Sequence, residues 1–218
     1  MRRIYGEVSG CRLSGWDGAI RSLAILQHQQ RSNTTGKNAA DIALVIDAMD
    51  MMRKGGLDEF CLVNSDSDFT RLAQRSREDG LVVYGFGERK SPDALRNACS
   101  RFIYLENIVE AEPAKKNGAA ASGTDAAEKK ESPRKAVKII ERAIEDSDDA
   151  GWMNLANVGS RILGAAPDFD PRSYGCPNLS TLVTKSSGFE VRKEPGKPVF
   201  IRRKATGGKA AGRASGSG

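Results

Sequence analysis

Three aspartates are spaced so that they could share a metal ion. The apolar segment 59–64 (EFCLVN) is predicted to be a buried strand, and it runs directly into SDSD, which holds Asp66 and Asp68. Because parallel α/β sheets place their ligands at the carboxyl ends of their strands, both carboxylates are expected at such an end. Asp41 lies in the first turn of a helix predicted over 39–54, on the side that packs on the sheet.

Carboxylates that converge repel each other unless a cation lies between them, and hard oxygen ligands suit Mg²⁺ or Mn²⁺. Such an ion can activate a water molecule and stabilise a phosphodiester transition state. Each aspartate also has a structural interpretation: Asp68 could cap the next helix, Asp66 could end the strand in an Asx-turn, and Asp41 could complement the helix dipole. Asp47 and Asp50 point to other sides of the same helix and are expected to be solvated.

The composition is that of a soluble globular protein, with 39% hydrophobic and 28% charged residues in a chain of 218. No apolar run approaches the roughly 20 residues needed to cross a bilayer, and the start, MRRIYGEVSG, does not read as a signal peptide. We therefore expect a cytoplasmic protein without a membrane partner. Four cysteines without CxxC spacing and a single histidine exclude zinc, and Cys61 and Cys99 are expected to behave as small hydrophobic residues.

The net charge of +6 is unevenly distributed. Residues 1–110 hold 15 basic and 15 acidic side chains, whereas residues 111–218 hold 19 basic and 13 acidic side chains. A neutral half beside a basic half suggests chemistry in the first and binding to a polyanion in the second. The basic excess could equally be a solubilising surface.

Two folded parts are expected, at 1–109 and 133–204, because residues 110–132 and 205–218 lack large apolar side chains and are predicted to be a disordered linker and tail. The first part alternates strands with helices, which predicts an α/β fold with a parallel sheet and helices on both faces. The predicted strands are 2–8, 23–29, 59–64, 81–87 and 101–105, and the predicted helices are 16–22, 39–54, 68–79 with Asp68 as N-cap, and one that starts at Pro92 with Ser91 as its cap.

The second part follows a different pattern. Residues 134–146 form an amphipathic helix, in which Val137, Ile140 and Ile144 share one face. Two more helices are predicted at 154–166 and 178–186, followed by strands at 188–194 and 197–204. Three helices and a hairpin in about 70 residues are typical of a winged-helix domain.

The first part resembles the NYN domain, a branch of the PIN-like ribonuclease superfamily. The resemblance covers nearly all of residues 1–106 and lies in GKNAADIALVIDAMD, FCLVNSDSDFTRLAQRSREDG and VYGFGERKSPDALRNACSRFIYL. In that family, the aspartates of the K-x-x-x-D and S-D-x-D-F segments line a Mg²⁺ or Mn²⁺ site, which implies Asp41, Asp66 and Asp68 here. NYN domains begin with a central strand that carries an aspartate in a run like I-D-x-x-N, and this sequence shows no such run. The resemblance therefore implies a PIN-like sheet that is truncated at its N-terminal end.

Residues 135–204 resemble the OST-HTH (LOTUS) domain in the D-x-x-x-Y-G turn, the helix after it and the F-x-V hairpin. This resemblance implies binding of RNA, or of a protein partner in some members. Residues 150–218 carry 11 basic and 4 acidic side chains, and cations on a projecting hairpin suit phosphate contacts. Trp152 and Tyr174 could stack on bases, but we expect both in the core, together with Phe169, Phe189 and Phe200. The candidate nucleic-acid-binding residues are Lys37, Arg89, Lys90, Lys185, Arg192, Lys193, Lys197, Arg202, Arg203 and Lys204.

Two functions remain open from the sequence. The carboxylate trio favours a metal-dependent ribonuclease that the C-terminal module targets to RNA. The missing strand favours a non-catalytic RNA-binding scaffold, and the sheet edges that it would expose could promote self-association. An in-frame strand of the I-D-x-x-N kind upstream of Met1 would support the nuclease. A winged-helix regulator that binds DNA is a third, weaker alternative, because the companion domain resembles an RNA nuclease.

Overall fold

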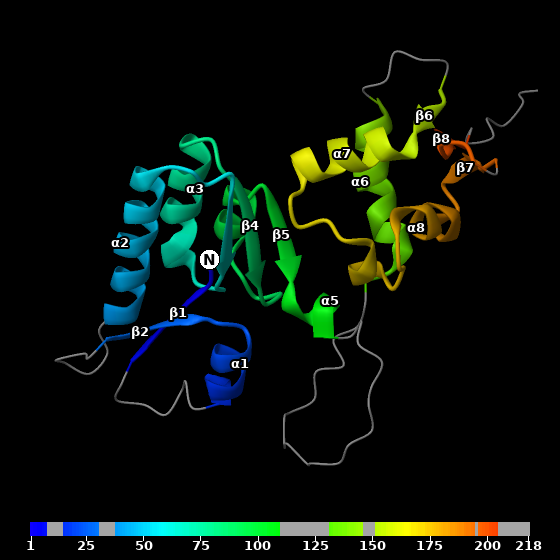
Figure 1. Cartoon of the computed structure of the whole chain (residues 1–218). Coiled ribbons are helices and arrows are strands. Elements are labelled where there is room, and N and C mark those ends of the chain that lie inside the picture. Colours follow the sequence, from blue (N-terminus) through cyan, green and yellow to red (C-terminus); the bar gives the residue numbers. More distant parts are fainter. Residues whose placement is uncertain (8–14, 31–37, 110–130, 146–150, 195, 205–218) are drawn as a thin grey trace, which may run out of the picture. The chain divides into compact units, whose positions relative to one another are not determined.

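The computed structural model describes residues 1–7, 15–30, 38–109, 131–145, 151–194 and 196–204 (Figure 1). Lys37, the tail and nearly all of the predicted linker lie outside these described residues. The chain divides into two compact units, the first made of residues 1–85 and 91–99 and the second of residues 86–90 and 100–218. No helix within the described residues is long and apolar enough to cross a membrane.

The N-terminal half alternates strands and helices, as the sequence predicts. Its elements are β1 (Arg3–Glu7), α1 (Asp17–Ser22), β2 (Leu26–Gln30), α2 (Ala39–Lys54), β3 (Glu59–Val63), α3 (Thr70–Glu78), β4 (Val82–Gly87), α4 (Asp93–Ala98), β5 (Arg101–Tyr104) and α5 (Leu105–Val109). Helix α2 has the predicted bounds, and it ends where Gly55 adopts a positive φ of 71°, a conformation that favours glycine.

The strands of this half form two separate sheets. β1 and β2 pair in parallel, and β3, β4 and β5 form a second sheet in that order. A helix follows both β3 and β4, as parallel connections require. The described residues contribute no strand that joins the two sheets, so β1 and β3 do not pair. The buried residues of the first unit, including Leu62, Phe69, Leu72, Val83 and Leu95, lie on β3 and β4 and in the segments and helices that follow them, except for Ala48 on α2.

A polar cluster fastens α2 to the β1–β2 sheet. Arg3 and Tyr5 on β1 both donate hydrogen bonds to the carboxylate of Asp47 on α2, and His28 on β2 stacks on Tyr5 with ring centroids 5.0 Å apart. The expectation that Asp47 is solvated is therefore wrong, whereas Asp50 is 54% exposed as predicted. The hydrogen bond from Arg3 is the largest influence on Asp47 and holds its pKa below the ordinary carboxyl value.

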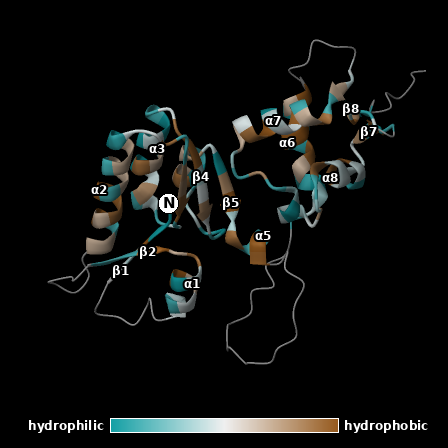
Figure 2. Ribbon diagram, in the orientation of Figure 1, coloured by the Kyte–Doolittle hydropathy of each residue, from teal (hydrophilic) through white to brown (hydrophobic). Residues whose placement is uncertain are grey.

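The C-terminal domain contains three helices and a small antiparallel sheet. Helices α6 (Pro133–Glu145), α7 (Leu155–Ala165) and α8 (Leu179–Ser186) surround a core that includes Ile140, Val158 and Leu182, all three fully buried, and whose other buried members are at most 9% exposed. Helix α6 alternates hydrophobic and hydrophilic residues along its length (Figure 2). The sheet has the order β6 (Met153–Asn154), β8 (Phe200–Arg203), β7 (Phe189–Arg192). Three helices and a hairpin confirm the predicted pattern, and β6 adds a short third strand.

Several helix starts differ from the prediction by one or two residues. A turn of 3-10 helix at Ser67–Phe69 precedes α3, and its N-cap is Asp66 rather than Asp68. Helix α4 begins at Asp93 after Pro92, and Ser91 does not cap it. In the C-terminal domain, Asn154 caps α7 and Asn178 caps α8, each by accepting a backbone N–H.

A buried polar network connects α5 to the turn of 3-10 helix at Pro171–Tyr174, within the second unit. Asn107 is 3% exposed and donates to the hydroxyl of Ser173 at 2.9 Å, while Arg172 donates to the backbone oxygen of Asn107 at 3.3 Å. Tyr104 on β5 donates to Asp168 at 2.6 Å. Residues 102–107 therefore belong physically to the unit that contains α6, α7 and α8.

Candidate metal centre and nucleic-acid interface

The acidic loop after β3 is organised by its own side chains. Asn64 accepts the backbone N–H of Asp66 at 2.7 Å, and Asp66 accepts the N–H of Asp68 at 3.1 Å. The second contact is an Asx-turn, so the structural interpretation of Asp66 is confirmed. Asp66 and Asp68 are both exposed. The loop is thus held in a fixed turn with both carboxylates at its surface.

The carboxyl end of β3 lies beside the start of α2. Asn38, the residue before α2, donates through its side chain to Asp68 at 3.5 Å. Asp41 is half-buried in the first turn of α2. The structure therefore brings Asp68 next to the residue that precedes α2, the helix whose first turn carries Asp41.

The oxygen atoms near Asp68 and Asn38 could bind a divalent cation, but they do not form a complete set of protein ligands. The Asp68 carboxylate and the Asn38 carboxamide both carry oxygen atoms of the kind that Mg²⁺ and Mn²⁺ bind. Within the described ranges, no three His, Cys, Asp or Glu side chains are grouped closely enough to hold a metal ion. Mg²⁺ is commonly bound through one or two carboxylates, with water and substrate phosphates as its other ligands. The donor chemistry fits that mode of binding and does not fit a cage of three carboxylates.

Arg89 and Lys90 are engaged in local contacts. Arg89 donates to the side-chain oxygen of Asn107 at 3.1 Å, and its guanidinium lies 5.4 Å from the centroid of the Tyr104 ring. Lys90 forms an ion pair with Glu88 at 2.6 Å. Arg89 therefore contributes to the packing around α5, and a role for it in RNA binding would require these contacts to break.

Four of the predicted nucleic-acid-binding cations on and beside the β7–β8 hairpin are paired with carboxylates. On the β7–β8 hairpin, Arg202 lies opposite Glu190 in the register and contacts it at 2.5 Å. Glu194 contacts both Arg192 and Lys197, at 3.0 and 2.6 Å. Arg203 pairs with Glu141 of α6 at 3.1 Å.

The other predicted cations present their charge differently. Among the residues that the structure describes, Lys185, Lys193 and Lys204 have no acidic partner, and all three are exposed. The sequence did not distinguish among these cations. Within the described part of the chain, the structure shows that some are paired with carboxylates and that Lys185, Lys193 and Lys204 have exposed, unpaired charges. The alternation of Glu190, Arg192 and Glu194 along the strand is the signal that could have revealed this pairing.

The aromatic residues of this domain differ in how deeply they are buried. Phe169 and Phe189 are buried, as predicted, and Tyr174 packs against the core beside Phe169 with ring centroids 5.7 Å apart. Trp152 and Phe200 are only half-buried and lie outside the buried core. The expectation that these two side chains are core residues is therefore wrong.

Taken with the α/β sheets and the three-helix domain with its hairpin, these features define a class of two-domain protein: a nuclease-like α/β domain with an acidic strand end, followed by a winged-helix module with exposed cations. The family models agree. The chain contains an NYN domain, matched over residues 1–106, followed by an OST-HTH/LOTUS domain, matched over residues 129–201. These two families point to a nuclease function related to RNA, and the second indicates RNA binding.

Two solved structures are similar to parts of the chain. An uncharacterized protein of Nitrosomonas europaea, solved by solution NMR, is 31% identical, with a TM-score of 0.30 over 45% of this chain and 97% of its own. A protein of unknown function from Vibrio parahaemolyticus is 16% identical, with a TM-score of 0.38 over 47% of this chain and 65% of its own. No curated protein matches the chain.

Proposed function

We propose that this protein is a metal-dependent ribonuclease that is held on RNA by its C-terminal domain. The observation that carries this proposal is the contact between Asn38 and Asp68. It places an exposed carboxylate from the end of β3 beside the first turn of α2, where Asp41 lies. Side chains from two segments, Asn38 before α2 and Asp68 after β3, meet there near a strand end, which is where α/β folds bind their ligands.

The residues at this place would act in distinct ways. The Asx-turn of Asp66 fixes the loop, so Asp68 keeps its position opposite the start of α2. Asp68 and, from the first turn of α2, Asp41 would hold Mg²⁺ or Mn²⁺, with water and phosphate oxygens as further ligands. The chemistry that such an ion supplies when bound is activation of water and neutralisation of phosphodiester charge. The small number of protein ligands predicts weak metal affinity.

The exposed cations of the C-terminal domain would position the RNA. Lys185, Lys193 and Lys204 are available for phosphate contacts, which give affinity without sequence specificity. The described residues of the C-terminal domain hold no group of three His, Cys, Asp or Glu side chains that could bind a metal ion. RNA bound by this domain would therefore be cut at the acidic loop of the N-terminal domain.

A cleavage assay with matched variants tests the proposal. The full chain is incubated with end-labelled single-stranded RNA and Mn²⁺, as the wild type and as Asp68→Asn and Asp50→Asn. Asp50 is an exposed aspartate of α2 and serves as the control for loss of one negative charge. We expect the wild type and Asp50→Asn to cut RNA, and Asp68→Asn to lose about tenfold or more of the rate, the lower end of the loss seen around metal sites.

The competing function is a non-catalytic RNA-binding scaffold. It is favoured by the division of the strands into two separate sheets and by the use of Asp66 as a cap. If the wild type binds RNA but leaves it uncut, and Mn²⁺ titration calorimetry shows no heat that depends on Asp68, the scaffold replaces the nuclease.

A further inference from the structure

A cavity of about 350 Å³ opens beside the β7–β8 hairpin of the C-terminal domain. Its lining combines flat apolar side chains with charged ones: Trp152, Arg192, Glu194, Lys197, Pro198 and Phe200. Ligand pockets begin at about 300 Å³, so this volume suits one small group rather than an extended helix. Trp152 and Phe200 are both half-buried and lie outside the core cluster.

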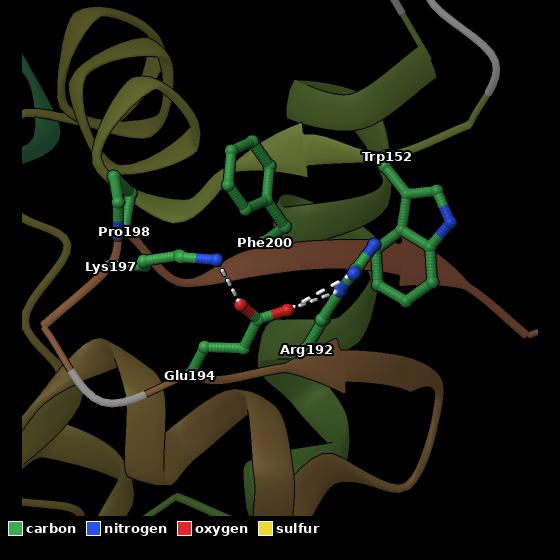
Figure 3. Close-up of a pocket in the computed structure, with 6 residues that line it drawn as sticks. All are labelled: Trp152, Arg192, Glu194, Lys197, Pro198 and Phe200. Atoms are coloured by element: carbon green, nitrogen blue, oxygen red, sulfur yellow. Dashed lines mark hydrogen bonds and ion pairs between the residues drawn. The ribbon is translucent and has the colours of Figure 1, made fainter.

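The charged wall of the cavity already holds an anion of the protein's own. Glu194 accepts from Arg192 through one carboxylate oxygen at 3.1 Å and from Lys197 through the other at 2.6 Å. Figure 3 shows Glu194 between these two cations. The hydrogen bonds from Lys197 and then Arg192 hold the pKa of Glu194 below its ordinary value, so the carboxylate is charged. Arg192 and Lys197 are 66% and 69% exposed, and exposed ion pairs of this kind are easily exchanged.

The aromatic side of the cavity, formed by Trp152 and Phe200, is held in place by neighbouring side chains. The guanidinium of Arg202 lies 4.8 Å from the centroid of the Trp152 ring, and Glu190 holds Arg202 from the neighbouring strand. Gly151, with φ 82°, precedes the tryptophan, and a Cβ atom there would come within 3.1 Å of the Arg202 side chain. The indole is therefore fixed at the cavity by a stacked cation whose own position is constrained.

We propose that this cavity binds one unpaired nucleotide of single-stranded RNA, with its base against Trp152 and Phe200 and its phosphate on Arg192 and Lys197 in place of Glu194. This inference rests on the proposed RNA function and adds a nucleotide pocket to the phosphate contacts proposed for Lys185, Lys193 and Lys204. Glu194 occupies the phosphate position until RNA arrives. Aromatic rings stack on any base, so this site favours unpaired RNA over duplex without reading a sequence.

The mixture of groups distinguishes a nucleotide from an acidic peptide. A glutamate or aspartate side chain would satisfy the two cations, as Glu194 does, but it would leave Trp152 and Phe200 without a partner. A nucleotide offers a planar π-face and an anion within one unit, and both walls of the cavity are then used.

Tryptophan fluorescence in the full chain tests the site directly. The chain has two tryptophans, so Trp16→Phe, which changes an exposed residue, leaves Trp152 as the reporter. We expect oligoadenylate to quench this emission and a duplex of equal length to do so much less. Trp152→Ala should weaken binding of the oligonucleotide about tenfold or more, because one stacked base accounts for roughly 5- to 150-fold in affinity. Trp152→Phe should retain most of the affinity, and a melting curve of each variant identifies any that does not fold.

Substitutions of the charged wall separate phosphate binding from general attraction. Arg192→Ala with Lys197→Ala should weaken binding more than Lys138→Ala, which removes an exposed cation of α6. Glu194→Gln should strengthen binding by about two- to fivefold, since it removes the competing carboxylate of an exposed pair. Weaker binding by Glu194→Gln, or equal quenching by oligoglutamate, would overturn the proposal. If Trp152→Ala binds RNA as well as the wild type, the nucleotide site is refuted while RNA binding stands; if the wild type binds no RNA, both fall.

Discussion

Replacement of Asp170 should reveal how the D-x-x-x-Y-G turn stabilises the C-terminal domain. The Asp170 side chain is 8% exposed and contacts the Arg172 guanidinium at 2.7 Å. It also accepts the backbone N–H of Arg172 at 2.9 Å, which makes it the cap of the 3-10 turn. Burial alone would raise the pKa of Asp170, but the hydrogen bonds from Arg172 outweigh it and hold the pKa below the ordinary value.

The expected magnitude follows from these contacts. Loss of a cap costs about 1 kcal/mol, and removal of one partner from a buried ion pair costs about 3–5 kcal/mol. Arg172 is 36% exposed and would keep its hydrogen bond to the backbone oxygen of Asn107, so its charge would be only partly uncompensated. We therefore expect Asp170→Ala to lower the free energy of unfolding by about 2–4 kcal/mol.

Urea unfolding in the Trp16→Phe background, followed by Trp152 emission, measures this change. The matched control is Glu190→Gln, whose ion pair with Arg202 is as short, at 2.5 Å, but whose side chains are 40% and 43% exposed. Exposed pairs contribute about 0–1 kcal/mol, so the control should change little. Equal effects of the two variants, or a loss below about 1 kcal/mol for Asp170→Ala, would refute the reasoning from burial.

The same pair makes a prediction about pH. Because the pKa of Asp170 is lower in the folded state than in the unfolded state, its stabilising contribution is present above the ordinary carboxyl pKa of about 3.9. That contribution is lost as the pH falls through the folded-state pKa. The difference in stability between the wild type and Asp170→Asn should therefore stay constant from pH 7 down to about pH 5 and shrink only as the pH falls below about 4.

Three further changes test other parts of the structure. Asp47→Asn should lower the stability of the N-terminal unit by about 1–3 kcal/mol in urea unfolding, because Arg3 and Tyr5 lose their charged acceptor; an unchanged midpoint would contradict this. Iodoacetamide at pH 8 should modify Cys61, which is exposed, and spare Cys99, whose pKa burial raises to about 11; equal labelling of the two would be the contrary result. Lys204→Ala should weaken RNA binding and reduce its salt dependence, whereas Arg203→Ala should do less because Arg203 is paired with Glu141; the opposite ranking would show that this pair does not withhold the charge.

The sequence predicted elements whose signals are local. Helix α2 was found with its correct bounds because Gly55 marks its end and its apolar residues recur at helical spacing. The loop after β3 was placed because an apolar segment ran directly into polar residues, although the prediction that this strand is buried holds only for Leu62. These features depend on neighbours within a few residues, and such neighbours are visible in the sequence.

The errors concern contacts between distant residues. Asp47 was expected in solvent because a helical wheel gives only its angle, and nothing local shows that Arg3 and Tyr5 lie above it, more than 40 residues earlier. The cap at Asp66 was assigned to Asp68 because a 3-10 turn before an α-helix has no distinct sequence signal. Trp152 was assigned to the core because hydrophobicity does not show that Arg202, from the far strand of the hairpin, would hold it at a cavity.

The network around Asn107 has a consequence for the modular exchange of domains. The NYN match ends at residue 106 and the OST-HTH match begins at 129, yet Asn107 and Ser173 are bonded within one compact unit. A gene fusion that joined this OST-HTH domain to another nuclease at those limits would remove the Asn107 oxygen that accepts from Arg172 and the Asn107 amide that donates to Ser173, and would leave Arg172 only its contacts with Asp170. Transplantation of the domain should therefore succeed only when residues 100–109 are inherited with it, so the unit of shuffling is longer than the unit of sequence similarity.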